Sequence, residues 1–232
     1  MKDHSNPSPV TAAIIVAAGR GVRAGGGTPK QWRDLGGRPV VSRAVDQLRG
    51  IADQVIVVVH PDDMVLAIEM FRGTVTLVAG GDTRTESVRA AIELLDGSTT
   101  TRVLIHDAAR PLVSEALLRR VLDALDDSPA AAPALPVTDA LWIGTEGQVT
   151  GSRPRDNLWR AQTPQGFHYE AILAAYGAHT ESANDDVEVA LAHGIPVRIV
   201  RGDESNLKLT YPDDFRRAEK ELATEMDVRT GN

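Results

Sequence analysis

Short apolar runs alternate with amphipathic stretches through the first half of the chain, and this alternation limits the folds that the sequence can form. The expected strands are β-branched and apolar on both faces, and apolar residues recur at helical spacing between them. Strands are expected at 11–17, 54–59, 75–79, 102–106 and 131–136, with helices at 40–48, 62–71, 85–95 and 114–125. A strand, helix, strand unit repeated four times predicts a Rossmann-like, mostly parallel sheet with helices on both faces.

The alternation stops at residues 138–162. This segment contains Gly144, Gly147 and Gly151 between short apolar pieces, which is typical of a β-hairpin. An isolated hairpin cannot bury its own apolar face, so we expect a protruding β-arm that packs on a second copy of the chain. The remaining predicted elements are helices at 168–176 and 185–192, a strand at 197–200 and a closing helix at 212–223.

Length and composition narrow the class of protein. The 232 residues suffice for one domain with a full core, expected at 11–225 behind a disordered tail at 1–10. No apolar stretch is long enough to cross a bilayer, and the absence of cysteine excludes thiol chemistry and suits a reducing cytoplasm. The net charge of −7 argues against a nonspecific nucleic-acid binder, although a basic pocket can still hold a nucleotide. We therefore expect a cytoplasmic protein without a membrane or nucleic-acid partner.

A glycine-rich stretch with two cations follows the first predicted strand. Ligands of such sheets bind at the carboxyl ends of the strands, where backbone N–H groups of a glycine loop can approach phosphates. Arg23 and Lys30 supply charge along the loop. Residues 19–24 also match the dinucleotide pattern Gly-x-Gly-x-x-Gly/Ala, but the loop continues through three more glycines, and no acidic residue closes the second strand. The sequence therefore argues against a nicotinamide oxidoreductase, while a flexible surface loop remains the structural alternative.

Two further polar segments follow the third and fourth strands of this half. Residues 80–88 place two glycines at a strand end, which suits contact with a base or ribose, or an ordinary turn with Thr83 or Thr85 as helix N-cap. In the segment 106–111, Asp107 comes directly after a buried strand and precedes small residues and an arginine. Such a carboxylate is a natural Mg²⁺ ligand facing a phosphate, and an Asp–Arg pair in a turn is its structural alternative.

These segments together are far more specific than any one of them. They read Ala-Ala-Gly-x-Gly-x-Arg-x(6)-Lys-Gln, Gly-Gly-x-x-Arg-x-x-Ser-Val and His-Asp-Ala-Ala-Arg-Pro, with Leu-Trp-x-Ala-Gln-Thr-Pro-Gln-Gly-Phe and Asn-Leu-Lys-Leu-Thr further on. In this order and spacing they closely resemble the 2-C-methyl-D-erythritol 4-phosphate cytidylyltransferases of the non-mevalonate isoprenoid pathway. The resemblance covers residues 11–222. It implies a fold of the nucleotide-diphospho-sugar transferase type and a Mg²⁺-dependent transfer of CMP from CTP to a sugar-alcohol phosphate.

The resemblance also implies roles for individual residues. The residues implied to stabilise the charge developing on the phosphates are Arg23, Lys30 and Lys208. The residues implied to bind CTP are Ala17, Ala18, Gly19, Gly21, Gly81, Asp82 and Ser87. The residues implied to bind the acceptor are Asp107, Arg110, Asp139, Arg155 and Thr163, with Asp107 also a metal ligand. Arg155 would reach across from the arm of the partner in a homodimer.

Two departures from the family pattern concern the acceptor. Ala140 follows Asp139 where the family often has threonine, and Asn184 stands where a Thr-Asp-Asp sequence is usual. A ribitol 5-phosphate cytidylyltransferase therefore remains an alternative. More distant alternatives are a transferase that uses another nucleotide, such as a molybdopterin or sugar-nucleotide enzyme, and a catalytically silent nucleotide-binding module.

Overall fold

The computed structural model describes residues 8–20 and 28–230 of the chain. Most of the predicted N-terminal tail lies outside these described residues, and so do the predicted loop residues Gly21 and Arg23. Within the described part of the chain, no helix combines the length and the apolar content needed to cross a membrane.

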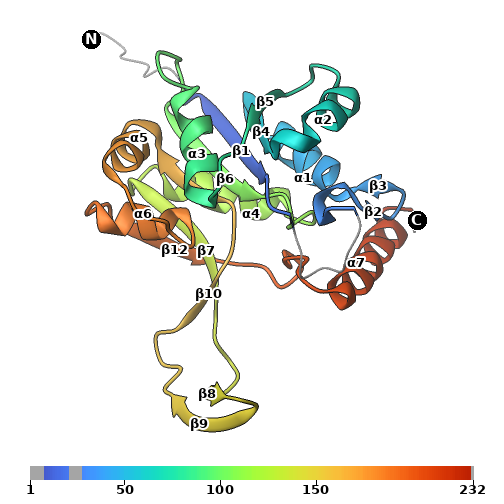
Figure 1. Ribbon diagram of the computed structural model, residues 1–232, viewed down its shortest axis with the longest axis vertical. Helices are drawn as coiled ribbons and strands as arrows, with labels where there is room; N and C mark the ends of the chain where they lie inside the picture. The colour runs from blue at the N-terminus through green and yellow to red at the C-terminus, as the bar shows by residue number, and fades with distance from the viewer. Residues whose placement is uncertain (1–7, 21–27, 231–232) are drawn as a thin grey trace.

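A mixed β-sheet runs through the middle of the molecule, with helices packed on both of its faces (Figure 1). The hydrogen-bonded order is β10-β7-β11-β6-β1-β4-β5, and β12 also pairs with β7. The strands are β1 (Thr11–Ala17), β4 (Gln54–Val59), β5 (Thr76–Ala79), β6 (Arg102–Asp107), β7 (Ala130–Pro136), β10 (Trp159–Ala161), β11 (Gln165–His168) and β12 (Val197–Arg201). Neighbours pair in parallel except at β10 and β11. The prediction of a mostly parallel α/β sheet is confirmed.

Side chains of the central strand β1 alternate between two hydrophobic layers, because successive residues of a strand point to opposite faces. Ala13 and Ile15 pack with α1, α2 and α4, whereas Ala12 and Ile14 pack with α3, α5 and α6. All four are fully buried, which is why the strand is apolar on both faces. The helices are α1 (Val40–Arg49), α2 (Met64–Phe71), α3 (Arg84–Glu93), α4 (Glu115–Ala124), α5 (Tyr169–Ala178), α6 (Asp186–Ala192) and α7 (Pro212–Thr230).

A third, smaller hydrophobic cluster joins α7 to the segment after the glycine-rich loop. Phe215 and Ala218 of α7 pack there against Leu35, Leu112 and Leu209. The segment after the glycine-rich loop contains three short elements, η2 (Lys30–Trp32), β2 (Asp34–Leu35) and β3 (Arg38–Pro39). Another short helix, η3 (Pro61–Asp63), precedes α2. Because Leu209 is buried in this cluster, the cluster anchors the segment that carries the neighbouring residue Lys208.

The sequence patterns do not predict β10 and β11, and one boundary of the arm is corrected. Residues 159–161 were expected in the arm, but they pair with residues 134–136 of β7 in the main sheet. The returning chain meets the edge of β7 there, so its backbone groups gain partners that an isolated arm would not offer. β11 inserts antiparallel between β6 and β7. Strands of three or four residues are too short to show a periodicity.

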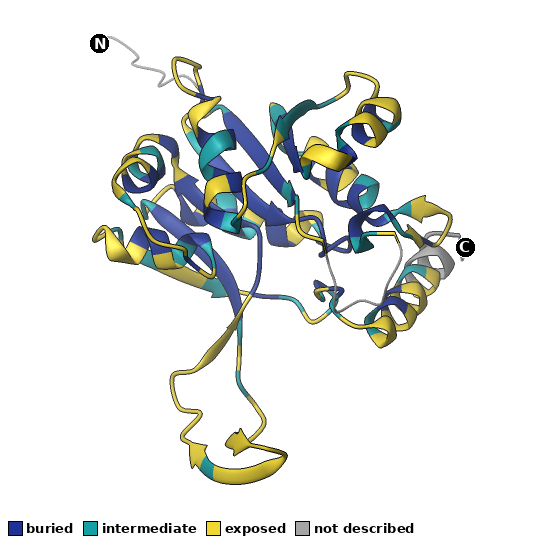
Figure 2. Ribbon diagram, viewed as in Figure 1, coloured by how far each residue is buried: buried dark blue, intermediate teal, exposed yellow. Residues whose placement is uncertain are grey.

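The predicted β-hairpin is present and projects away from the sheet (Figure 1). It consists of β8 (Leu141–Thr145) and β9 (Gln148–Arg153), joined by a two-residue turn at Glu146 and Gly147, both with positive φ. The hairpin is exposed along nearly its whole length (Figure 2). Its contact with a second copy of the chain remains a prediction.

Candidate active site

The segments that follow β1, β5 and β6 line a pocket of about 210 Å³ at the carboxyl edge of the sheet. Parallel strands end at the same edge, so motifs that are far apart in the sequence meet there. The predicted site residues that line this pocket are Ala17, Ala18, Gly19, Lys30, Gly81, Asp82, Ser87, Asp107 and Lys208.

A second pocket of about 140 Å³ adjoins the first. It is lined by the predicted residues Arg110 and Thr163, together with Asn184 and Asp185, which directly precede α6. Arg84, Asp107 and Lys208 line both pockets. These three side chains therefore mark the junction between the two, where bound groups on either side would meet.

The turn before α3 closes tightly over the first pocket. Thr83 is the helix N-cap: its hydroxyl accepts from the N–H of Glu86 at 3.1 Å, and the Glu86 carboxylate accepts from the N–H of Thr83 at 3.2 Å. This capping box decides between the two predicted N-caps in favour of Thr83. A Cβ at position 81 would lie 2.6 Å from Glu86 Cβ, so the turn requires glycine there.

The exit of the glycine-rich loop is anchored to the sheet by buried polar contacts. Gln31 Nε2 donates to the carbonyl of Ala17 at 2.8 Å, which ties η2 to the end of β1. Lys30 lies beside it, and its ammonium donates to the carbonyl of Leu209 at 3.0 Å. The loop cation Lys30 and the lysine-bearing segment 206–209 are thus held together at one side of the first pocket.

Asp107 is surrounded by three cations. Lys208 Nζ lies 2.7 Å from Oδ2, Arg84 Nη2 lies 3.7 Å from Oδ1, and Arg110 Nε lies 4.0 Å from Oδ2. Burial alone would raise the pKa of Asp107, but the charges of Lys208, Arg84 and Arg110 outweigh it and lower the pKa. The carboxylate therefore stays ionised, and the junction carries a net positive charge that suits phosphate groups.

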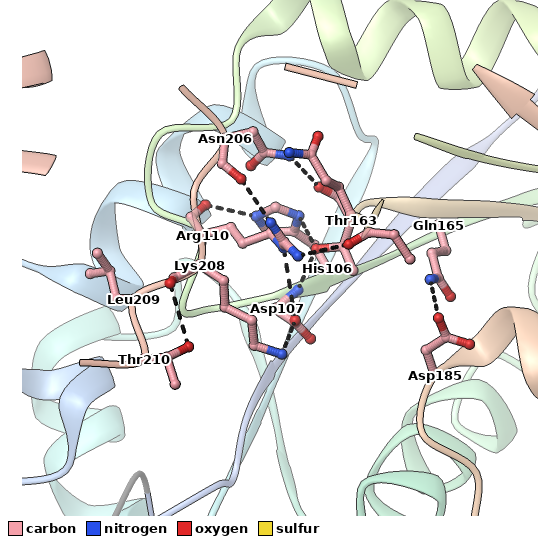
Figure 3. Close-up of polar contacts among 12 residues, drawn as sticks. His106, Asp107, Arg110, Thr163, Gln165, Asp185, Asn206, Lys208, Leu209 and Thr210 are labelled. Carbon is pink, nitrogen blue, oxygen red and sulfur yellow. Dashed lines mark hydrogen bonds and ion pairs between the residues drawn. The ribbon is translucent and has the colours of Figure 1, made fainter. Parts of the chain in front are cut away.

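A chain of buried hydrogen bonds fixes the backbone that presents Asp107 (Figure 3). The N–H of Asp107 donates to the Thr163 hydroxyl at 3.0 Å, and His106 Nε2 donates to the carbonyl of Arg110 at 3.0 Å. Burial lowers the pKa of His106 to about 4, so its ring is neutral and Nδ1 accepts from the Thr163 hydroxyl. The three bonds are mutually consistent: the neutral His106 ring donates from Nε2 and accepts at Nδ1, and the Thr163 hydroxyl donates to His106 and accepts from Asp107.

Arg110 connects the same loop to two other segments. Its Nη1 donates to the carbonyl of Asn206 at 2.7 Å and its Nη2 to the carbonyl of Ala161 at 3.1 Å. Asn206 in turn donates from Nδ2 to the carbonyl of Thr163 at 2.8 Å (Figure 3). The guanidinium lines the second pocket, yet both Nη groups bind backbone carbonyls. Arg110 thus ties β10 and the segment before Lys208 to the end of β6.

Two predicted site residues lie in the arm, away from both pockets. Asp139 precedes β8, and Arg155 follows β9 with its Nη1 bound to the carbonyl of Thr138. Neither residue lines either pocket in this chain. Gly21 and Arg23 fall outside the described residues, so their positions are not part of this geometry.

Arg84 is the junction residue to which the sequence patterns assigned no role. It is the first residue of α3, and its guanidinium binds the carboxylate of Asp186 through both Nη groups, at 2.8 and 2.7 Å. The signal was the fixed arginine in the Gly-Gly-x-x-Arg motif. Its partner lies 102 residues further along the chain, so no local pattern could reveal the pair.

The residues present fit a divalent cation held mainly by substrate phosphates. Among the described residues, no three His, Cys, Asp or Glu side chains gather as a metal cage. Mg²⁺ needs no such cage, because it usually binds through one or two carboxylates and phosphate oxygens. Asp107 supplies an ionised carboxylate between the pockets, and its Oδ1 has Arg84 at 3.7 Å as its ion-pair contact.

The chain is similar to known proteins over most of its length. Residues 11–224 match the family model of the 2-C-methyl-D-erythritol 4-phosphate cytidylyltransferases, IspD. The chain is 56% identical over 218 residues to the enzyme of that name from Cereibacter sphaeroides strain KD131, covering 92% of this chain and 97% of the relative. It is similar to the crystal structure of the Thermus thermophilus enzyme, with a TM-score of 0.77 and 32% identity over 90% of this chain and 98% of that one.

Other relatives are longer. The chain is 57% identical over 225 residues to the bifunctional enzyme IspD/IspF of Rhodobacter capsulatus, which covers 95% of this chain but 59% of the relative. The chain therefore spans about three fifths of the length of the bifunctional proteins that it matches.

Proposed function

The chain belongs to the 2-C-methyl-D-erythritol 4-phosphate cytidylyltransferase family, and on that premise we propose that it transfers CMP from CTP to 2-C-methyl-D-erythritol 4-phosphate and releases pyrophosphate. The observation that carries the proposal is the pair of adjoining pockets that share Arg84, Asp107 and Lys208. The first pocket, with its glycine-rich walls, would hold CTP, and the second would hold the acceptor. The shared cations would then face the reacting phosphates.

The reaction needs alignment and charge neutralisation more than proton transfer. A phosphate monoester is an anionic nucleophile at neutral pH, so no general base is required. An oxygen of the acceptor phosphate forms a bond to the α-phosphorus of CTP. The bond from that phosphorus to the oxygen bridging the α- and β-phosphates breaks, and this oxygen leaves with pyrophosphate. Lys30 and Lys208 line the nucleotide pocket and would neutralise the charge that develops on the α-phosphate, together with Arg23.

A bound Mg²⁺ would supply further neutralisation of the triphosphate, with Asp107 as its protein ligand. The other residues proposed to contact the acceptor lie in the second pocket or in the arm. Thr163 and Arg110 line that pocket, whereas Asp139 and Arg155 would come from the arm of a second subunit. Exposed apolar residues of the arm support this homodimer, because Trp142 is 71% exposed and Val149 is 58% exposed. The cysteine-free sequence suits a cytoplasmic enzyme.

Pyrophosphate release from CTP and Mg²⁺ tests the proposal, with methylerythritol phosphate and ribitol phosphate offered as acceptors in parallel. We expect release with methylerythritol phosphate and little with ribitol phosphate. Release with ribitol phosphate alone would keep the reaction class and replace the acceptor. Asn184, one of the two departures from the family pattern, lines the proposed acceptor pocket and would be a reason for such a change. CTP binding without turnover on either acceptor would contradict the enzyme assignment and favour a silent nucleotide-binding module.

A further inference from the structure

A fully buried carboxylate lies behind the junction of the two pockets. Asp186, the first residue of α6, has no exposed surface and accepts from both Nη groups of Arg84 and from the hydroxyl of Tyr176 at 2.6 Å. A buried charge is tolerated only when it is paired and hydrogen-bonded. Burial and the charge of Asp186 raise the pKa of Tyr176, so the phenol keeps the proton that it donates.

The backbone around Asp186 is fixed as well. Its N–H and that of Val187 both donate to Gln165 Oε1 of β11 at 3.0 Å. Gln165 Nε2 then donates to Asp185 Oδ2 at 3.0 Å, and Asp185 Oδ1 caps α6 by accepting from Glu188 N–H at 3.0 Å. The start of α6 is therefore attached to the sheet, and Asp186 is a rigid partner for Arg84.

Arg84 stands between two carboxylates with different roles. One is Asp186, in direct bidentate contact, and the other is Asp107, at 3.7 Å. Without Asp186, attraction would draw the guanidinium onto Asp107, which Lys208 already contacts at 2.7 Å. Two of the five N–H groups of Arg84 bind Asp186, and the side chain remains 23% exposed where it lines both pockets.

We propose that Arg84 binds a reacting phosphate at the junction of the two pockets, and that Asp186 and Tyr176 are positioning residues that hold its guanidinium there and away from Asp107. This inference rests on the proposed cytidylyl transfer and adds a residue to it. A purely structural ion pair between α3 and α6 would not require its guanidinium to line both pockets.

Arg89 provides a matched control within the same helix. It also joins α3 to α5, donating from Nε to the carbonyl of Tyr176 at 3.1 Å and from Nη2 to the carbonyl of His179, but it lines neither pocket. We expect Arg84→Gln to lower kcat/KM at least about 100-fold, since it removes a charged donor from the transition state. Arg89→Gln should lower Tm, because it removes hydrogen bonds between α3 and α5, and leave kcat/KM within about threefold of the wild type.

Two further variants separate position from stability. Arg84→Gln leaves Asp186 buried without its charge partner, so the double variant Arg84→Gln/Asp186→Asn should regain Tm but not turnover. Free guanidinium at millimolar concentration should partly restore kcat of Arg84→Ala and have no such effect on Arg89→Ala. Tyr176→Phe should lower kcat about fivefold with KM nearly unchanged, because one hydrogen bond to Asp186 is lost.

Wild-type turnover in the same assay distinguishes the two levels of proposal. If the wild type is inactive, the proposed function fails and this inference falls with it. If the wild type is active but Arg84→Gln keeps its kcat/KM, only the role of Arg84 is overturned. Equal activity loss in the Arg84 and Arg89 variants, or recovery of turnover together with Tm in the double variant, would also make Arg84 a structural residue.

Discussion

At the scale of single residues, the neutral ring of His106 is built into the loop that presents Asp107. Burial lowers the pKa of His106 from its ordinary value of 6.5 to about 4, because the protonated ring would lose its solvation and Nδ1 could no longer accept from Thr163. The folded protein thus binds this proton less readily than the unfolded chain. This difference in proton binding makes the free energy of unfolding about 3 kcal/mol larger above pH 6.5 than below pH 4. The extra stability is lost as the pH falls from 6.5 toward 4.

NMR titration of the histidine rings in the protein without metal or nucleotide checks this sign. We expect the His106 resonances to stay in the neutral form down to about pH 5, below the ordinary pKa of 6.5 for a histidine ring. The His106→Asn variant assigns the signals by their disappearance. A His106 ring that titrates near pH 6.5 would contradict the hydrogen-bond roles deduced for Thr163 and the carbonyl of Arg110.

At the scale of elements, β5, β1 and α3 approach one another closely beside the first pocket. A Cβ at position 80 would lie 2.6 Å from Ala18 Cβ and 2.8 Å from Ser87 Oγ. Gly80→Ala must therefore push apart two predicted CTP contacts, and we expect a loss of about 1–3 kcal/mol in the free energy of unfolding and a higher KM for CTP. Urea unfolding and initial rates at varied CTP measure both quantities.

Gly177→Ala is the matched control for that substitution. Gly177 lies in α5, and a Cβ there would meet nothing within 4 Å. Alanine should be neutral or stabilise the protein by up to about 1 kcal/mol, with KM for CTP unchanged. If Gly80→Ala behaves like this control, α3 does not pack against the end of β1 as closely as the structure has it.

The elements also show which parts of the fold and of the candidate site could be predicted from the sequence. Long apolar strands and amphipathic helices were predictable because their periodicity is local, and the strand-end rule located the pocket from three motifs. β11 was not predicted, because the strands that it pairs with are distant in the sequence. Its Gly166 lies in the core, where a Cβ would meet Val121 Cγ1 at 2.7 Å, so this position carries no apolar side chain that would mark a strand. Arg84 escaped for the same reason, since only the fold brings Asp186 to it.

At the scale of the whole molecule, the arm exposes large apolar side chains to solvent. Trp142 and Ile143 of β8 are 71% and 45% exposed, although isolated hairpins gain little stability by themselves. Within this chain no residue of β8 or β9 lines either pocket, and Arg155 follows β9. If the arm packs on a second subunit, then association and catalysis depend on the same surface.

Trp142→Glu should weaken association, because a charge would replace an aromatic side chain in the expected interface. Analytical ultracentrifugation should show a shift from dimer to monomer, and activity per subunit should fall on dilution and recover as the protein concentration rises. Val65→Glu is the control, since Val65 of α2 is an equally exposed apolar residue at 68% and lies outside the arm. A Trp142→Glu protein that is monomeric yet fully active at all concentrations would mean that each subunit completes its own site, and that Arg155 does not act across an interface.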